Sequence, residues 1–229
     1  KHINIIKSME FTTLKSEVVL HHLGIESKDP KRLAEFYAKT MQMEIVASEN
    51  NIWHCLGPNR LLIFSPGIPR KLSFATYACK DTHKLGKIKQ KVIKEGLEII
   101  PFNSIYLQKG AFSVFDPDNH QISFGVPLQR KQYENALFAP LQHLTMQSLN
   151  VTQYVDFYKN KLGFAVSDRV INDDGEVTTC FMRSNREHHS LACFKSNKIG
   201  IDHHSYEVGD WNLIKDWCDY FSELGIKLF

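Results

Sequence analysis

The sequence contains no apolar run that approaches the roughly 20 residues needed to cross a bilayer. Its first residues, "KHINIIKSMEF", lack the longer apolar stretch and the cleavage site of a secretory signal. Cysteine is scarce: there are five residues, an odd number, and none of them forms a C-x-x-C pair. These absences exclude a disulfide framework and predict a cytoplasmic protein with reduced, buried thiols and no membrane association.

A strong excess of charge of one sign is also missing. The net charge is +3 and 23% of the residues are charged, which is too weak a bias to predict nucleic-acid binding. Lysines gather between Lys80 and Lys94, but their spacing is typical of the solvent face of a helix. With 43% hydrophobic residues in 229, the chain can bury one large core or two cores of about 100 residues each.

What the sequence does contain is a repeated order of predicted elements. A strand, a helix and then short strands follow one another from residue 18, and the same order restarts at residues 71, 140 and 201. The first helix is marked by Asp29 at its N-cap and Pro30 at its first position. The predicted helices cover 30–42, 82–96, 151–163 and 210–225, and the opening strands cover 18–27, 71–79, 140–149 and 201–208.

Rounds one and three superpose without a gap at an offset of 121 residues. This offset matches His22 with His143, Ser27 with Ser148, Asp29 with Asn150, Phe36–Tyr37 with Phe157–Tyr158, and Met43 with Phe164. Such self-similarity predicts an α+β fold of four βαβββ modules in two tandem halves, each half a cup-shaped mixed sheet with its helices outside.

The repeat also predicts the domain organisation. We expect an N-terminal extension over 1–17, a first domain over 18–127, a linker over 128–140 and a second domain over 141–229. The fourth module has its first strand and helix but not its last three strands, so it is incomplete in this sequence. We therefore expect the chain to be part of a longer protein.

Strand parity selects candidate functional histidines, because successive side chains of a strand point to opposite faces. His143 shares a face with Thr145 and Gln147, and His203 shares a face with Ser205 and Glu207. The opposite, more apolar faces should pack on the helices, so His143 and His203 should both look into the concave side of the sheet. Parity alone does not make them metal ligands.

Four such modules resemble the vicinal oxygen chelate superfamily, and more closely its type I extradiol ring-cleaving dioxygenases. The resemblance covers residues 18 to 229 and is most specific in "LQHLTMQSLNVTQYVDFYKNKLGF", "FMRSNREHHSLACF" and "DHHSYEVGD". "FDPDNHQISFGV" matches a strand-turn motif of that family, with Asn119–His120 in place of Gly-Asn.

The resemblance implies roles for the histidines. His143 and His203 fall on the two histidine ligands of a non-haem Fe(II) site with two histidines and one carboxylate, a set that leaves adjacent positions for substrate and O₂. His189 matches the acid–base residue beside the iron, where an imidazole can exchange protons near neutral pH. For His188 and His204 we expect a supporting role, either in packing or in orienting their neighbours through hydrogen bonds.

The first half lacks a comparable ligand set. Its positions equivalent to the ligands are expected to be His22, Ser73 and Ser123, and one imidazole with two hydroxyls binds a transition metal poorly. We expect a metal-free copy in which His22 is a relic or a core residue. The 50-residue spacing of Ser73 and Ser123, applied to His203, puts the third ligand, a glutamate, near position 253, beyond Phe229.

The leading functional prediction is an extradiol dioxygenase that opens a catecholic ring with O₂ and takes part in the breakdown of aromatic compounds. We expect Fe(II), with Mn(II), Zn(II) or Ni(II) as alternatives, a small aromatic diol as substrate, no nucleic acid partner, and a homo-oligomer. Two other functions stay open: a glyoxalase- or epimerase-like isomerase using Zn, Ni or Co, and a metal-free protein of the same fold that binds a small molecule.

Overall fold

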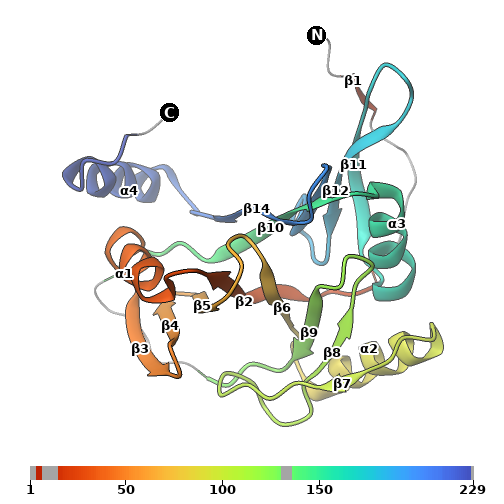
Figure 1. Ribbon diagram of the computed structural model, residues 1–229, viewed down its shortest axis with the longest axis horizontal. Helices are drawn as coiled ribbons and strands as arrows, with labels where there is room; N and C mark the ends of the chain where they lie inside the picture. The colour runs from red at the N-terminus through yellow and green to blue at the C-terminus, as the bar shows by residue number, and fades with distance from the viewer. Residues whose placement is uncertain (1–3, 7–14, 130–135, 228–229) are drawn as a thin grey trace.

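The computed structural model describes residues 4–6, 15–129 and 136–227 (Figure 1). The parts of the predicted extension and linker at 7–14 and 130–135 lie outside the described residues. The strands are β1 (Asn4–Ile6), β2 (Val19–Ser27), β3 (Glu44–Glu49), β4 (Ile52–Gly57), β5 (Arg60–Pro66), β6 (Leu72–Ala78), β7 (Ile100–Pro101), β8 (Phe112–Phe115), β9 (Gln121–Gly125), β10 (Leu141–Ser148), β11 (Ala165–Ile171), β12 (Val177–Arg183), β13 (Leu191–Lys195) and β14 (Gly200–Tyr206). The helices are α1 (Pro30–Thr40), α2 (Thr82–Lys94), α3 (Val151–Asp156), the π-helix η1 (Phe157–Leu162) and α4 (Trp211–Glu223).

Two mixed sheets hold these strands. The eight-stranded sheet has the order β3-β4-β5-β2-β6-β9-β8-β7, in which β2 runs parallel to β5 and antiparallel to β6, and β6 runs parallel to β9. The six-stranded sheet has the order β1-β11-β12-β13-β10-β14, with β10 parallel to β13 and antiparallel to β14. The predicted α+β class and the modular arrangement are confirmed.

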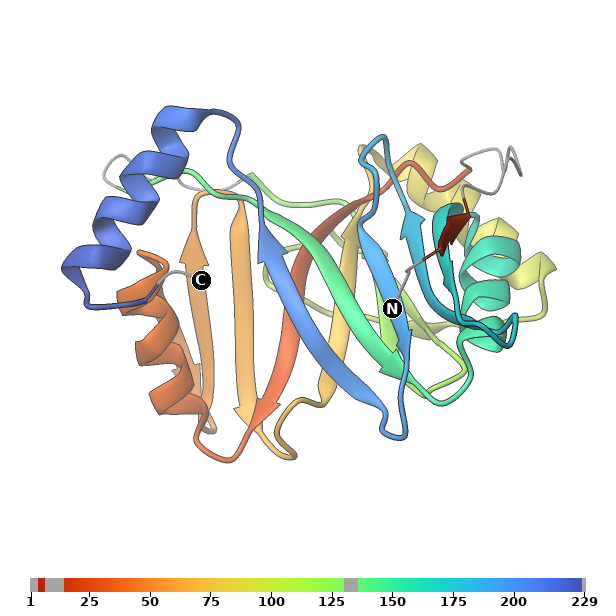
Figure 2. The ribbon, with the colours of Figure 1, turned by 90° about the horizontal axis from the view of Figure 1, so that it is seen from above.

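The two sheets lie back to back. β2 contacts β10 at the centre of the molecule, and the outer strands of each sheet curl away from the other sheet (Figure 1). Seen from above, β14 and β10 cross over β2 and β6 in the middle of the molecule (Figure 2). One apolar core runs between the halves, because the buried cluster joins residues of both, and the ring of Tyr77 packs edge-on against Phe164. The cups therefore open in opposite directions.

The repeat extends to irregularities in strand pairing. Between β2 and β6 the register shifts after Leu20 and after Gly24, and between β10 and β14 it shifts after Leu141 and after Thr145. Each shift in the second half lies 121 residues after its counterpart in the first. A bulge bends a strand and re-aims its side chains, so the duplicated bulges show that both cups have the same curvature at the same place.

Helix starts also follow the repeat. The carboxylate of Asp29 accepts a hydrogen bond from the backbone N–H of Arg32, and the side chain of Asn150 accepts one from that of Gln153. Asp81 and Asp210 cap α2 and α4 in the same way. Each cap satisfies a backbone donor that the first turn of a helix leaves free. The cap is therefore a property of the module.

The third helix lies in its predicted range but changes type along its length. α3 ends at Asp156, and the chain continues as the wider π-helix η1 until Gly163, whose φ of 81° ends it. The wider turns lie where Tyr158 donates a hydrogen bond of 3.0 Å to the buried carboxylate of Asp116 in the first half. π-Turns are rare and commonly accompany such special contacts.

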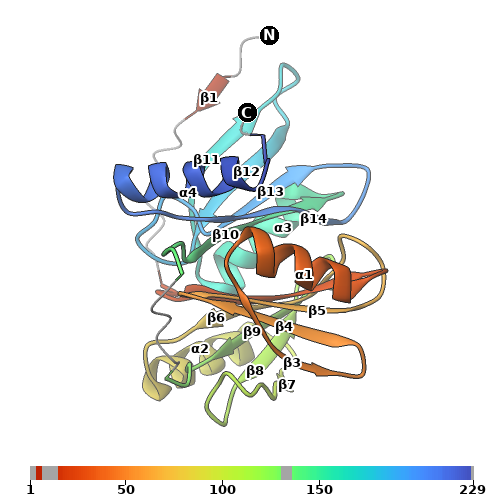
Figure 3. The same ribbon diagram turned by 90° about the vertical axis from the view of Figure 1, so that its left-hand side faces the viewer.

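No helix among the described residues combines the length and the apolar character that a bilayer span requires. α4 lies at the edge of the molecule, close to α1, as the side view shows (Figure 3). Trp217 on α4 is buried, and its indole N–H donates to the backbone carbonyl of Phe138 at 3.3 Å. Trp217 therefore belongs to the face of α4 that packs on the rest of the molecule.

Candidate metal centre

His143 on β10 and His203 on β14 face one another inside the second cup. Their Nε2 atoms are 3.2 Å apart, and their ring planes are inclined at 75°. His203 lies opposite Thr145 in the register, so the two histidines sit diagonally across the strand pair rather than side by side. His143 and His203, 60 positions apart in the sequence, thus both direct their Nε2 atoms toward one point.

The bulge in β14 aims His203 at this point. The register passes from the Thr145–His203 pair to the Met146–Ile201 pair, so Asp202 is the extra residue. Two successive side chains at a bulge can share a face, and here the carboxylate of Asp202 lies 2.7 Å from Nδ1 of His203. Asp202 was not predicted from the sequence. The available signal was that Asp202 stands directly before a histidine pair, but simple alternation assigns Asp202 and His203 to opposite faces.

Hydrogen bonds on the far side of each ring fix the tautomers. A carboxylate only accepts, so His203 donates from Nδ1 to Asp202 and keeps a lone pair on Nε2. The amide oxygen of Gln142 lies 2.5 Å from Nδ1 of His143, and the Gln142 amide nitrogen donates to the backbone carbonyl of His189 at 2.7 Å, which sets the amide orientation. His143 therefore also donates from Nδ1 and presents a lone pair at Nε2.

Two nitrogen lone pairs that face each other at 3.2 Å repel unless a cation or a proton lies between them. Two ligands about 2.1 Å from one ion, at an angle of about 100°, are about 3.2 Å apart. A carboxylate on the far nitrogen of a metal-binding histidine is a common support of such sites. The donor set, its spacing and its support therefore fit a divalent transition metal.

The third predicted histidine lies beside this pair. The ring centroid of His189 is 4.4 Å from that of His143, and the ring of Phe181 packs edge-on against His189 at 5.1 Å. Burial lowers the pKa of His189, and the nearby imidazoles of His188 and His203 lower it further. Burial, followed by His189 and His203, lowers the pKa of His143 to about 4. These rings are neutral at pH 7, as ligands and bases must be.

The sequence "HHSLACF" predicts a strand that begins at His188, and the structure corrects this start. β13 starts at Leu191, and the pair lies in the bend that precedes it. The bend is nevertheless anchored: Gln142 donates to the carbonyl of His189, and Ser167 Oγ donates to the carbonyl of His188 at 2.5 Å. Hydrogen bonds from β10 and β11 hold the pair in the absence of a β-ladder.

His204 points away from the cup and packs between the halves. Its ring lies 5.6 Å from the ring of Tyr37 on α1, and its Nε2 is 3.1 Å from the hydroxyl of Tyr206. Burial, and then the neighbouring His203, lowers the pKa of His204 to about 4. His204 is thus a packing residue in the contact between the halves.

The stability of the metal-free protein should fall in mild acid because of His204. The unfolded chain binds a proton below pH 6.5, whereas the folded protein excludes it until about pH 4, so this stabilisation is complete above pH 6.5 and is lost as the pH falls toward 4. His204→Phe keeps an aromatic ring against Tyr37 but cannot titrate. Urea unfolding at pH 7.5 and pH 4.5 should show a loss of stability about 1–3 kcal/mol larger in the unmodified protein than in the variant.

His83→Phe, on the exposed face of α2, serves as the matched control and should keep the full pH dependence. Equal losses in the unmodified protein and in His204→Phe would contradict the assignment.

The cup of the first half is filled where the second carries its histidines. Gly24 matches Thr145 at the 121-residue offset, and Gly24 pairs with Phe74 as Thr145 pairs with His203. Phe74, and not Ser73 as predicted, is therefore the counterpart of His203, and Ser73 is the extra residue of the bulge, as Asp202 is in the second half. A side chain on Gly24 would come within 2.4 Å of the Phe74 ring.

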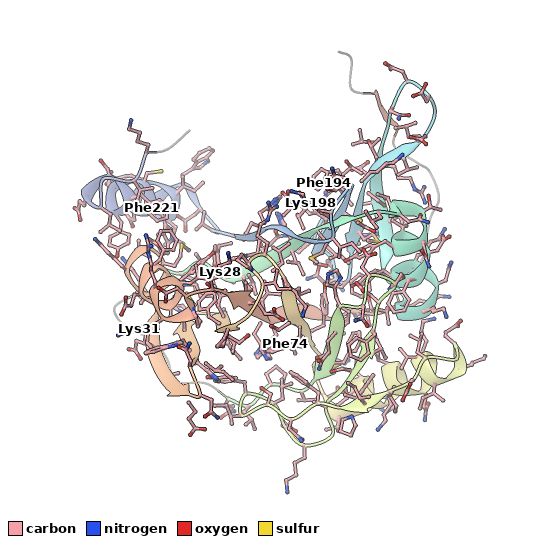
Figure 4. All side chains as sticks on the ribbon, in the orientation of Figure 1. Lys28, Lys31, Phe74, Phe194, Lys198 and Phe221 are labelled. Carbon is pink, nitrogen blue, oxygen red and sulfur yellow. The ribbon has the colours of Figure 1, made fainter. Side chains whose placement is uncertain are left out.

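Figure 4 places Phe74 on the concave side of the eight-stranded sheet. Its ring packs against that of His22, which is fully buried, at 5.6 Å, and Ser123 exchanges a 2.7 Å hydrogen bond with Ser113. Ser73 lies instead beside Ser65, with 3.4 Å between the hydroxyl oxygens. These contacts account for the position of His22 as a core residue.

Within residues 4–6, 15–129 and 136–227, no group of three or more His, Cys, Asp or Glu side chains is arranged to hold a metal ion. Glu207 is exposed, and its backbone N–H bonds to Pro140. A separate cavity of about 450 Å³ adjoins the site between α1 and β14, and its lining includes Tyr37, Asp202 and His203. The described residues thus bring two of the three predicted ligands together.

Comparisons with known proteins agree with the fold. Residues 141–228 match the model of the Glyoxalase/Bleomycin resistance protein/Dioxygenase superfamily. Metapyrocatechase 2 of Cupriavidus necator is 22% identical over 206 residues, a match that covers 80% of this chain and 60% of the relative. The chain therefore spans about 60% of the length of that curated relative.

Two solved structures are similar over most of the chain. A halotolerant catechol dioxygenase superposes with a TM-score of 0.76 at 15% identity, covering 92% of this chain and 77% of its own. Homoprotocatechuate 2,3-dioxygenase from Arthrobacter globiformis superposes with a TM-score of 0.73 at 17% identity, covering 95% and 73%. At these identities the likeness establishes the fold.

Proposed function

We propose that this chain, which has the fold of the vicinal oxygen chelate dioxygenases, belongs to an enzyme that cleaves a catecholic ring with O₂ at a non-haem ferrous site. The observation that carries the proposal is the pair of lone-pair-bearing Nε2 atoms of His143 and His203, 3.2 Å apart. The similarity to a metapyrocatechase and to catechol dioxygenases supports the same reaction class.

His143 and His203 would hold the metal as the two histidines of a set that a carboxylate completes. A set of two histidines and one carboxylate favours Fe(II) and leaves room for both reactants. When bound, the iron would orient the diol and O₂ next to each other and carry charge between them. The phenyl ring of Phe74 at the equivalent place supports the assignment of the first half, 18–127, as a metal-free domain, and of 141–229 as the catalytic one.

His189 would act as the acid–base residue. Its ring stacks beside that of His143, so a substrate hydroxyl bound next to the ligands lies within its reach. Because its Nδ1 is engaged by His188 at 3.0 Å, its Nε2 is the atom that takes up the hydroxyl proton and later returns a proton to the opening ring. Phe181 against its edge excludes water from one side.

The test is turnover by the full-length protein. After anaerobic loading with Fe(II), addition of catechol or 2,3-dihydroxybiphenyl in air should consume one O₂ per diol and give the yellow ring-opened product. Zn(II)-loaded protein is the control and should give neither signal, since Zn(II) has no redox chemistry. Iron-loaded protein that takes up no oxygen with any diol would refute the proposal, and an isomerase would act with Zn(II) or Ni(II) in the absence of O₂.

A further inference from the structure

A second imidazole lies directly behind the candidate acid–base histidine. Nδ1 of His188 is 3.0 Å from Nδ1 of His189, with the two rings perpendicular at 89°. On its other side, Nε2 of His188 is 2.5 Å from a carboxylate oxygen of Asp168 on β11. An unbroken chain of hydrogen bonds therefore runs from Asp168 through His188 to the ring that faces the site.

The local backbone builds this chain. The pairing of β11 with β12 shifts between Val166 and Asp168, and this bulge turns both Ser167 and Asp168 toward the bend that carries the histidines. Ser167 Oγ bonds to the carbonyl of His188, while the adjacent carboxylate bonds to its ring. Backbone and side chain of His188 are thus held by neighbouring residues of one strand.

The chain has a defined direction. A carboxylate can only accept, so His188 donates from Nε2, and a neutral His188 then has its lone pair on Nδ1. It accepts from Nδ1–H of His189, which leaves the lone pair of His189 on Nε2, toward the site. When His188 carries a second proton it donates from Nδ1 instead, and His189 then carries its proton on Nε2.

We propose that His188 and Asp168 are positioning residues that set the tautomer of His189 and connect its Nδ1 with solvent. This inference rests on the proposed function of His189. In the exchange, His189 gains a proton at Nε2 and releases its Nδ1 proton to His188, so the number of protons is conserved and the positive charge lies next to the carboxylate. The reverse exchange returns the proton to the product.

Exposure and charge agree with these roles. The His188 side chain is 59% exposed, so it can exchange protons with water, whereas the Asp168 side chain is 16% exposed. Among the described residues, the titratable groups that contact the His188 ring are Asp168 on β11 and His189 on its own segment, and β12 contributes only the Phe181 ring.

The first arm of the test measures turnover of the iron-loaded, full-length protein. His188→Ala and Asp168→Asn should each lower kcat about 10- to 100-fold, with KM and iron content unchanged. The double variant should be no worse than His188→Ala, because the two residues act as one unit. Added imidazole should restore part of the kcat of His188→Ala, since the ring position opens to solvent. His83→Ala and Asp174→Asn, both exposed, are the matched controls and should keep full activity.

The second arm needs no metal and no turnover. In metal-free protein with ¹⁵N-labelled histidine, His189 should carry its proton on Nδ1, and His188→Phe should shift it to Nε2, the tautomer usual in water. A His189→Gln variant identifies the resonances.

Unchanged kcat in both variants, loss of iron with kcat, or a tautomer that His188→Phe leaves unaltered would overturn the inference. If the unmodified protein fails to open any ring but the tautomer shifts as expected, the proposed function fails and the hydrogen-bond chain stands.

Discussion

Replacing His203 or His143 with alanine should abolish tight iron binding and lower ring-cleavage kcat/KM by at least about 10³-fold, since the metal is expected to supply several kcal/mol of the catalysis. Each substitution removes one of the two facing Nε2 atoms. After either substitution, one imidazole and a distant carboxylate remain of the three ligands, and these two do not form a binding site for the metal. Iron content after dialysis, measured together with oxygen uptake, checks the result.

The fold should survive these substitutions. Both side chains lie in a half-open cup, and the exposed fraction of His203 is 49%, so neither replacement leaves a large cavity in the core. His83→Ala is the control for a histidine that faces solvent. Iron bound at full stoichiometry in both ligand variants would show that the metal is held elsewhere.

A graded effect is expected from Asp202. Its carboxylate orients His203 without facing the metal position, so Asp202→Asn should weaken metal affinity about 10- to 100-fold and leave some activity. A loss as large as that of His203→Ala would instead indicate that Asp202 binds the metal itself.

Arg60→Ala should destabilise the protein by about 3–5 kcal/mol, the loss expected when a buried charge network is broken. Arg60 on β5 is fully buried. Its guanidinium donates to the carbonyls of Met41 at 2.8 Å, Leu137 at 2.9 Å and Ala139 at 3.2 Å. It also lies over the ring of Trp217, 5.4 Å from its centroid.

The Arg60 side chain thus contacts three parts of the molecule: the end of α1, the segment that leads into β10, and α4. Removing it leaves the buried carbonyl of Ala139 and the partly buried carbonyls of Met41 and Leu137 without this donor. Arg32→Ala, on the exposed face of α1, should change the free energy of unfolding by less than about 0.5 kcal/mol. Urea unfolding of both variants measures the difference, and a small effect of Arg60→Ala would show that water replaces its donors.

The fold could be predicted because the sequence repeats. The offset that matches His22 with His143 also matches helix caps, strands and bulges, and one repeated pattern is a far stronger signal than any single propensity. The facing arrangement of His143 and His203 followed from strand parity. Their roles as metal ligands, the role of His189 and the oligomeric state remain predictions.

The features that strand parity could not predict lie where the regular alternation of side chains between the two faces is interrupted. The bulge at Asp202 brings two successive side chains to one face, so the partner of His203 was missed. Ser73 was chosen in place of Phe74 because the sequence pattern did not fix the alignment of these two strands to one residue. The bend at 188–190 carries no periodic pattern, so His188 and His189 were placed on a strand that begins only at Leu191. Both irregularities occur at the candidate site, where a regular ladder would aim side chains differently.

The contact of His204 with Tyr37 has a consequence for how such an enzyme could change over time. His204, which follows the candidate ligand His203, packs against Tyr37 on α1, so the first half supports the position of β14. A substitution on the inner side of α1, remote from any substrate, would displace β14 and register as altered iron retention. Under the proposed function, selection for metal binding would therefore also act on residues of the first half.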